Sequence, residues 1–275
     1  MGDTRPLPQP DSETAQPRTP PPRTPSRTRP RRRRYLKRAA IAAAACTALC
    51  VTGAAVLWCV TPSADEATQL ASEQAAAHGI AFPGPPAPAN FSRPLIATED
   101  HRFNAEPGID LLAVGRVVEG KLTGAPDQGG ATLEQQLAKM LYTPTQTGFS
   151  AEVKQVVVAF KLNLKFAKQQ ILDLYAEVAY YGHGYYGLEQ ASCGYFGHPS
   201  RELTVVQGAM LAGVVNAPSV DDPISDPANA RVRLTHVIDR MVAVGYLTPT
   251  QGQQALRAPL GLVTDSAAAS ASAGC

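Results

Sequence analysis

The segment from Ala39 to Val60 constrains the chain most, because it runs for 22 residues without a charged side chain. A helix rises about 1.5 Å per residue, so this segment spans the roughly 30 Å hydrocarbon core of a bilayer. A basic block, Arg31 to Arg34 with Lys37 and Arg38, precedes it and places the N-terminus in the cytoplasm. The sequence therefore predicts a single-pass signal anchor in the plasma membrane, with the rest of the chain extracytoplasmic.

A second interpretation of this region stays open. The run Arg32-Arg33-Arg34-Tyr35-Leu36-Lys37 also fits a twin-arginine export signal. Thr61-Pro62-Ser63-Ala64 would then be a cleavage region. The uncleaved anchor is favoured, because 22 residues exceed the usual apolar region of a signal peptide.

Composition divides the remaining chain. Residues 1–38 are rich in Pro, Arg and Thr and are expected to be a disordered cytoplasmic tail. Residues 61–89 are expected to be a membrane-proximal linker with one helix from Glu66 to His78. Residues 90–259 should fold, and the Ala/Ser-rich residues 260–275 should be disordered. Eleven Arg and Lys gather in the tail with three acids, which leaves an acidic domain and argues against nucleic acid as its partner.

Helical signals dominate residues 90–259. Thr132 and Gln135 form a capping box that predicts a helix to Tyr142, and Ser150 is the expected cap of the next. Further helical patterns cover residues 109–117 and 171–179. A second capping box, Thr204 and Gln207, precedes a helix over residues 208–215, and an N-cap at Asp226 precedes one over residues 227–244. A short helix begins at Thr248-Pro249. The sequence predicts a mainly α domain. The five cysteines show no metal-ligand spacing, and Cys193 and Cys275 are expected to be isolated.

Several polar residues lie at the expected ends of helices, where their side chains can reach a substrate. Glu99 and Asp100 end a short apolar run, and a partly desolvated carboxylate there suits a general base. The turn Gly129-Gly130 feeds a helix N-terminus, whose N–H groups can hold an anion such as pyrophosphate. Taken singly, such features are more often a solvated helix end or an ordinary loop, and a lone lysine is more often solvated.

In their order along the chain, these motifs resemble glycosyltransferase family 51. This family contains the peptidoglycan glycosyltransferases of penicillin-binding proteins and the monofunctional transglycosylases. The matches fall in four motifs: Glu99, Asp100, Phe103 and Gly108; Gly129, Gly130, Thr132, Gln135 and Gln136; Lys168, Ile171, Leu172 and Tyr175; and Arg233, Val237 and Met241. The resemblance covers about residues 90–250, and no transpeptidase domain is expected after it.

The resemblance implies a lysozyme-like glycosyltransferase lobe plus a small membrane-dipping lobe. A cleft between them would bind lipid-linked disaccharide-pentapeptide and the growing glycan strand. Glu99 would deprotonate the acceptor hydroxyl, which attacks the anomeric carbon with inversion as polyprenyl pyrophosphate leaves. The implied substrate-binding residues are Asp100, Phe103, Gly129, Gly130, Thr132, Gln135, Gln136, Lys139, Lys154, Lys168 and Arg233. The resemblance establishes no cofactor, a divalent cation at the pyrophosphate stays open, and other cell-wall synthases are candidate partners.

The sequence departs from the family in its third motif, Arg-Lys-x-x-Glu-x-x-x-Ala. Ala151 stands for the Arg, Glu152 for the Lys and Gln155 for the second essential Glu. Glutamine keeps the shape of glutamate but cannot take up or transfer a proton at neutral pH. Outside this motif, Glu106 replaces a His, Ala131 a Ser, Glu177 an Asn and His183 a usual Arg.

Two functions therefore stay open. The first is glycan-strand polymerisation with reduced activity, in which Glu99 and Gln155 occupy the two catalytic positions and face one cleft. The second is a catalytically impaired paralogue that binds lipid-linked precursor or glycan as a scaffold or regulator of cell-wall synthesis. A lysozyme-like hydrolase fits less well, because a pyrophosphate cradle and a membrane anchor suit a lipid donor.

Overall fold

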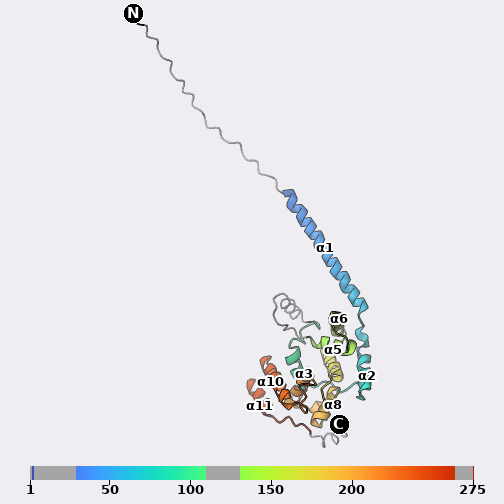
Figure 1. Ribbon diagram of the computed structural model, residues 1–275, viewed down its shortest axis with the longest axis vertical. Coiled ribbons are helices and arrows are strands. Elements are labelled where there is room, and N and C mark those ends of the chain that lie inside the picture. Colours follow the sequence, from blue (N-terminus) through green and yellow to red (C-terminus); the bar gives the residue numbers. More distant parts are fainter. Residues whose placement is uncertain (1, 3–28, 110–130, 264–274) are drawn as a thin grey trace. The chain divides into compact units, whose positions relative to one another are not determined.

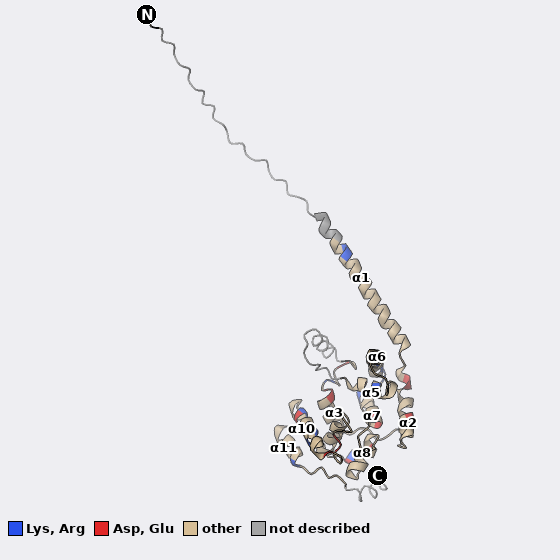
Figure 2. Cartoon of the chain, viewed as in Figure 1, with Lys and Arg blue, Asp and Glu red and all other residues tan. Residues whose placement is uncertain are grey.

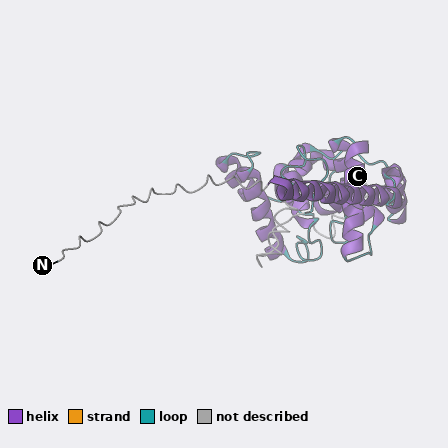
Figure 3. Ribbon diagram, turned by 90° about the horizontal axis from the view of Figure 1, so that it is seen from above, coloured by secondary structure: helices purple, strands orange, loops and turns teal. Residues whose placement is uncertain are grey.

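The computed structural model describes Gly2, residues 29–109, residues 131–263 and Cys275, with side chains from residue 35 onward. Every regular element in these residues is a helix (Figures 1 and 3). A single bridge between Tyr180 and Tyr186 is the one strand-like pairing among them. The prediction of a mainly α fold is therefore confirmed. The chain divides into two compact units, Met1–Gly53 and Ala54–Cys275.

Helix α1, Arg29–Val60, contains the predicted anchor but begins ten residues before it. Among the described residues it is the helix long and apolar enough to cross a membrane, and the part of it coloured blue for Lys and Arg in Figure 2 lies near its beginning. The expected disorder of residues 29–38 is wrong. Arginine and lysine are good helix formers, and extending an existing helix avoids the unfavourable nucleation step.

The segment expected to be a linker belongs to the folded domain. The 3-10 helix η1, Ala64–Glu66, is followed by helix α2, Ala67–Ala77, close to the predicted helix. Ala64, Ala67 and Ala71 are buried in the larger hydrophobic core, where α2 packs against α5 and α7. Small side chains at helical spacing make this close packing feasible. The domain therefore begins near Ala64 rather than at residue 90.

Three helices form the smaller core: α3, Ala89–Glu99; α9, Val205–Val214; and α10, Pro227–Ala243. Gly208 allows α9 to approach α3, since a Cβ there would lie 1.8 Å from the carbonyl oxygen of Asn90. The predicted capping box of Thr204 and Gln207 and the predicted N-cap at Asp226 are both present. This packing places the end of α3, with Glu99, beside α9 and α10.

The larger core contains α5, Leu133–Tyr142; α6, Phe149–Lys165; and α7, Lys168–Val178. The predicted capping box of Thr132 and Gln135 opens α5. The predicted cap at Ser150 is wrong by two residues, because Gly148, with φ of 90°, is the N-cap of α6. Only glycine adopts such a positive φ at little cost. The helix predicted for residues 109–117 falls almost entirely outside the described residues.

The C-terminal region holds α8, Leu188–Phe196; the 3-10 helix η2, Ser200–Glu202; and α11, Pro249–Arg257. Helix α11 is capped by Thr248 as predicted, whereas no helix was predicted for the residues of α8. Leu260 and Leu262 pack against the core, so the folded part continues past residue 259. Residues 264–274 of the expected disordered tail lie outside the described residues.

Cys193 on α8 forms a disulfide with Cys275, so the expectation that both are isolated is wrong. Their separation of 82 residues hides the pairing, because only the folded chain brings the two together. Cys46, Cys50 and Cys59 are free. The disulfide fits an oxidising compartment, where such bonds persist.

We expect Cys275→Ser to lower the melting temperature measured without reductant. A crosslink that closes a loop of 82 residues lowers the entropy of the unfolded chain. In the chain-entropy model this raises the free energy of unfolding by up to about 4.5 kcal/mol. Reductant should reproduce the loss in the wild type and leave Cys275→Ser unchanged, and Cys59→Ser serves as the matched control. Equal melting temperatures for the wild type and Cys275→Ser would contradict the stabilising role.

Candidate active site

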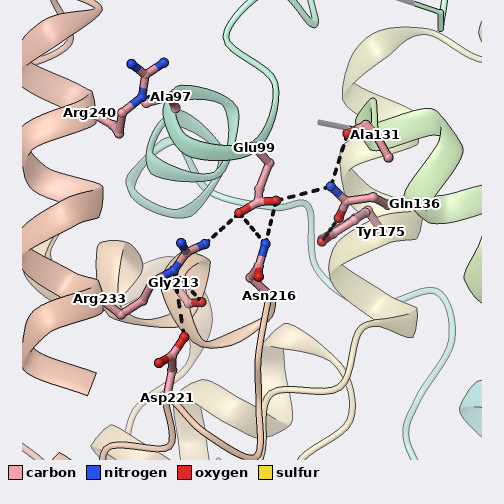
Figure 4. Close-up of polar contacts among 10 residues, drawn as sticks. All are labelled: Ala97, Glu99, Ala131, Gln136, Tyr175, Gly213, Asn216, Asp221, Arg233 and Arg240. Atoms are coloured by element: carbon pink, nitrogen blue, oxygen red, sulfur yellow. Dashed lines mark hydrogen bonds and ion pairs between the residues drawn. The ribbon is translucent and has the colours of Figure 1, made fainter. Parts of the chain in front are cut away.

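The Glu99 carboxylate is the centre of a polar network drawn from three other parts of the chain (Figure 4). Its Oε1 accepts hydrogen bonds from the Arg233 guanidinium at 2.8 Å and from Asn216 Nδ2 at 3.1 Å. Its Oε2 accepts from Asn216 Nδ2 at 3.0 Å and from Gln136 Nε2 at 3.3 Å. The Glu99 side chain is only 9% exposed. An ionised carboxylate can accept from all three donors at once.

Arg233 is positioned by the last turn of α9 and by the segment that follows it. Its Nε donates to the carbonyl oxygen of Gly213 at 3.2 Å and lies 3.9 Å from Asp221 Oδ2. A Cβ at Gly213 would lie 3.0 Å from the Arg233 side chain, so glycine leaves room for its stem. A planar guanidinium held in this way fixes the orientation of the carboxylate it contacts.

Gln136 reaches Glu99 from α5 and is oriented by α7. Its Oε1 accepts a hydrogen bond from the Tyr175 hydroxyl at 2.9 Å, which leaves its NH₂ group to face Glu99. Burial, and then the charge of Glu99, raise the pKa of Tyr175 well above its usual value. The Tyr175 hydroxyl therefore stays protonated and remains a donor.

Asp100, next to Glu99, is buried in the domain. Its Oδ2 accepts from the Leu133 N–H at 3.1 Å. Burial, and then the neighbouring Glu106 side chain, raise the pKa of Asp100 to about 8. The Lys168 ammonium lies 2.6 Å from Glu134 Oε1. Asp100 and Lys168 are thus both engaged in internal contacts.

Other expected site residues also make internal contacts. Phe103 is fully buried, and the Lys168 ammonium lies 4.4 Å from the centre of its ring. The Thr132 hydroxyl donates to the carbonyl oxygen of Gly108 at 2.9 Å, and Gln135 closes the capping box with Thr132. Gly108, with φ of 81°, passes so close to α6 that a Cβ would lie 2.8 Å from the Ala159 carbonyl oxygen.

Gln155 lies on α6, and its Nε2 donates to the Thr143 hydroxyl at 2.8 Å, at the C-cap of α5. Gln136, which contacts Glu99, is seven residues earlier on α5, about 10 Å along the helix axis. The two expected catalytic positions thus border different ends of α5. That Glu99 and Gln155 face one cleft stays a prediction.

The expected pyrophosphate cradle is described only in part. Gly129 and Gly130 lie outside the described residues, Lys139 is exposed, and Lys154 Nζ donates to Gln146 Oε1 at 3.0 Å. Within the described ranges, no group of three or more His, Cys, Asp or Glu is arranged to hold a metal ion. A divalent cation held by substrate phosphates is a separate matter and stays open.

Asn216 is the site residue that sequence reasoning missed. It lies outside the four motifs that were matched to the family, and no role was predicted for it. The contact with Glu99 joins residues 117 positions apart. It depends on the packing of α3 against α9, which no local sequence pattern reveals.

Comparison with known proteins places this site in a family. A model of the family described as Transglycosylase matches residues 66–242. Penicillin-binding protein 1F of Bacillus subtilis is 36% identical over 176 residues, which are 64% of this chain and 25% of that protein. Penicillin-binding protein 1A of Mycobacterium tuberculosis is 37% identical over 59% of this chain and 20% of its own length. The chain thus spans a quarter or less of these two relatives.

A Cupriavidus necator protein that carries the name transglycosylase is 32% identical over 175 residues, 64% of this chain and 76% of that protein. A crystal structure of penicillin-binding protein 1A from Haemophilus influenzae is 25% identical and gives a TM-score of 0.33. That alignment covers 48% of this chain and 16% of the other. The match to the family model confirms the resemblance seen in the motifs. Glu99 and the three residues that donate to it all lie in the matched region. The chain belongs to the transglycosylase family.

Proposed function

We propose that the chain polymerises peptidoglycan glycan strands from lipid-linked disaccharide-pentapeptide. The observation that carries this proposal is the Glu99 carboxylate, held by Arg233, Asn216 and Gln136. Membership of the transglycosylase family and relatives named penicillin-binding proteins support a cell-wall glycan as the product. The anchor-like helix α1 suits a substrate carried on a lipid.

In this proposal Glu99 is the general base. The contact from Gln136 is the longest of the network, at 3.3 Å, and an acceptor hydroxyl replaces it most readily. The hydroxyl proton passes to Glu99, the acceptor oxygen bonds to the anomeric carbon of the donor, and the bond to pyrophosphate breaks with inversion. General-base assistance of this kind contributes about 10²–10⁴-fold in rate.

The leaving pyrophosphate needs cations and N–H donors. We assign this role to the N-terminus of α5 with Gly129 and Gly130, and to Lys139 and Lys154. Lys139 is exposed on α5, and Lys154 makes only a neutral hydrogen bond to Gln146. Both ammonium groups can therefore turn to a phosphate without breaking an ion pair with any described residue.

The altered third motif lowers the expected rate without removing the base. Gln155 keeps a side chain of the same length in place through its bond to Thr143, but it carries no charge. Glu152 lies one helical turn before Gln155, near the proposed cradle. Its negative charge repels the negative charge of a pyrophosphate there. Ala151 is 2% exposed, so an arginine there requires repacking.

A non-catalytic role is the second candidate, and Gln155 is the observation that favours it. If the second carboxylate is indispensable, the chain retains the donor site without turning substrate over. It would then bind lipid-linked precursor or glycan as a scaffold or regulator. Polymerisation and precursor binding, measured on the same protein, separate the two candidates.

We expect wild-type protein in detergent to polymerise labelled lipid-linked precursor slowly, and Glu99→Gln to reduce this to background. The amide cannot take up the acceptor proton, so a loss of about 10²-fold or more is expected. Precursor binding, followed by titration, should persist in Glu99→Gln. The exposed Glu202→Gln serves as the matched control. Wild-type polymerisation at background, with binding intact, would favour the non-catalytic role.

We expect Gln155→Glu alone to leave the polymerisation rate unchanged or lower. A new carboxylate beside the buried Thr143 loses hydration without gaining a cation. Combined with Glu152→Lys, it should raise the rate about tenfold or more, because both changes act on one electrostatic site and are non-additive. Equal rates for wild type and the double variant would contradict this account of the third motif.

The junction after α1 supports an anchor that is not removed. The Lys161 ammonium donates to the carbonyl oxygens of Trp58, Thr61 and Pro62 at 2.7, 2.8 and 3.0 Å. Because all three acceptors lie in one short segment, Lys161 holds the C-terminal end of α1 against α6. Cleavage near Ala64 would remove all of them.

We therefore expect the mature protein to retain residues 58–62, as mapped by mass spectrometry of the purified chain. The tail before α1 should be cytoplasmic and Asp65 extracytoplasmic, because the basic block precedes the apolar segment. Reporter fusions at Asp65 test the orientation. A mature chain starting near Ala64 would instead support the cleaved signal.

A further inference from the structure

His183 is the one residue other than glycine that has a positive φ among those the structure describes. Its φ is 50°, a left-handed conformation that costs free energy for residues with a Cβ. It lies in the tight turn of residues 180–186, between two glycines and within the Tyr180–Tyr186 bridge. A conformational cost of this kind persists only where surrounding contacts compensate it.

The compensating contact is a hydrogen bond to Asp222. His183 Nδ1 lies 3.3 Å from Asp222 Oδ2, and Asp222 is only 4% exposed. Burial alone would raise the pKa of Asp222, but hydrogen bonds from Ile224 and Ser225 lower it below its usual value. Asp222 is therefore an ionised acceptor, and His183 Nδ1 carries the proton that it donates.

The 180–186 turn also meets the segment after α9 through its backbone. Gly182 passes so close to this segment that a Cβ there would lie 2.5 Å from the Pro218 carbonyl oxygen. Tyr195 of α8 is fully buried, and its hydroxyl donates to the Tyr181 carbonyl oxygen at 2.9 Å. The turn is thus held by the core of the domain and contacts the segment after α9 at two points, Pro218 and Asp222.

Residues 216–226 lie between α9 and α10 and include Asn216, whose amide donates to both oxygens of Glu99 (Figure 4). Asn216 is exposed, so packing of its side chain does little to hold it. Its position at Glu99 therefore depends on where the backbone of residues 216–226 lies. Whatever fixes that backbone also fixes one of the donors to Glu99.

Asp222 is tied to the rest of this segment in both directions. The Ala217 carbonyl oxygen accepts from the N–H groups of Val220 and Asp221 at 2.9 and 2.8 Å, which closes a compact turn just before Asp222. The Asp222 carbonyl oxygen accepts from the N–H of Asp226, the N-cap of α10, at 2.8 Å. A displacement of Asp222 is therefore passed on towards Asn216 and towards the start of α10.

We propose that His183 is a positioning residue for the reaction, because its hydrogen bond to Asp222 holds residues 216–226 where Asn216 can bind Glu99. The bond offsets the cost of the positive φ and fastens the segment to a turn that the core supports. The effect on catalysis rests on the proposed function, whereas the position of Asn216 can be measured without substrate.

NMR of the full-length protein in detergent, without substrate, tests the positioning. The chain has five asparagines, so labelling their side chains with nitrogen-15 gives a simple spectrum, and Asn216→Ser identifies the signal of Asn216. His183→Gly accepts the positive φ but has no imidazole. In this variant the Asn216 signal should move toward that of a solvated amide and exchange its protons with water faster. The signal of Asn90, whose amide donates to the Leu203 carbonyl oxygen, should stay in place.

Two further variants separate the hydrogen bond from general effects. Asparagine tolerates a positive φ better than most residues, and its NH₂ group can replace the Nδ1–H donor, so His183→Asn should restore the Asn216 signal at least in part. His198→Asn is the matched control, because His198 contacts Phe196 and Pro199 instead. It should leave the Asn216 signal unchanged.

The polymerisation assay tests the effect on catalysis. His183→Gly should lower kcat about tenfold with little change in KM, since a misplaced donor to Glu99 disturbs the reacting geometry more than substrate binding. In an Asn216→Ala background the same change should have little further effect, because the two residues act in series. Equal losses in both backgrounds would contradict action through Asn216.

An Asn216 signal that is unchanged in His183→Gly would overturn the proposal. So would a shift of Asn90 as large as that of Asn216, since the effect would then be general. A shift that His183→Asn does not reverse would reject the role of the bond to Asp222. If the wild type does not polymerise, the proposed function fails, and the Asn216 signal still decides whether His183 positions this residue.

Discussion

The ion pair between Glu99 and Arg233 joins residues 134 positions apart, and the arrangement of the site depends on it. Glu99 ends α3 and Arg233 lies on α10, so the pair forms only when both helices pack with α9. Gly208 and Gly213 of α9 permit that packing, the first against α3 and the second against the Arg233 side chain. Two small residues on one helix thus set the distance between a carboxylate and its guanidinium.

The same carboxylate is reached from the larger core by Gln136, which Tyr175 orients. Glu99 is therefore the place where the two hydrophobic cores meet through polar contacts. Immediately after it, Asp100 joins the end of α3 to the start of α5. Because Asp100 is the C-cap of α3 and also accepts a hydrogen bond from the first residue of α5, it can transmit small shifts of either helix to Glu99.

Much of this architecture follows from local sequence signals. The capping boxes at Thr132, Thr204 and Thr248 start helices where the sequence predicts, because the side-chain and backbone groups involved lie within four residues. Glu99 was identified for a similar reason, since its motif is contiguous. The contact of Asn216 with Glu99 and the Cys193–Cys275 disulfide were not, because each joins distant segments.

The errors at the domain boundaries also have a physical origin. Alanines of η1 and α2 resemble linker composition, yet their small side chains are what allows close packing in the core. The burial of Glu106 and its ion pair with Arg102 were likewise not predicted from the sequence. Burial and charge balance depend on neighbours in space, which composition does not report.

The central claim is that Glu99 and its donors support glycosyl transfer from a lipid pyrophosphate. The most direct measurement counts polyprenyl pyrophosphate released against glycosidic bonds formed by the purified full-length chain in lipid vesicles. The account predicts one pyrophosphate for each new bond, with the anomeric configuration of the donor inverted. Release of pyrophosphate without polymer, or retention of configuration, would contradict it.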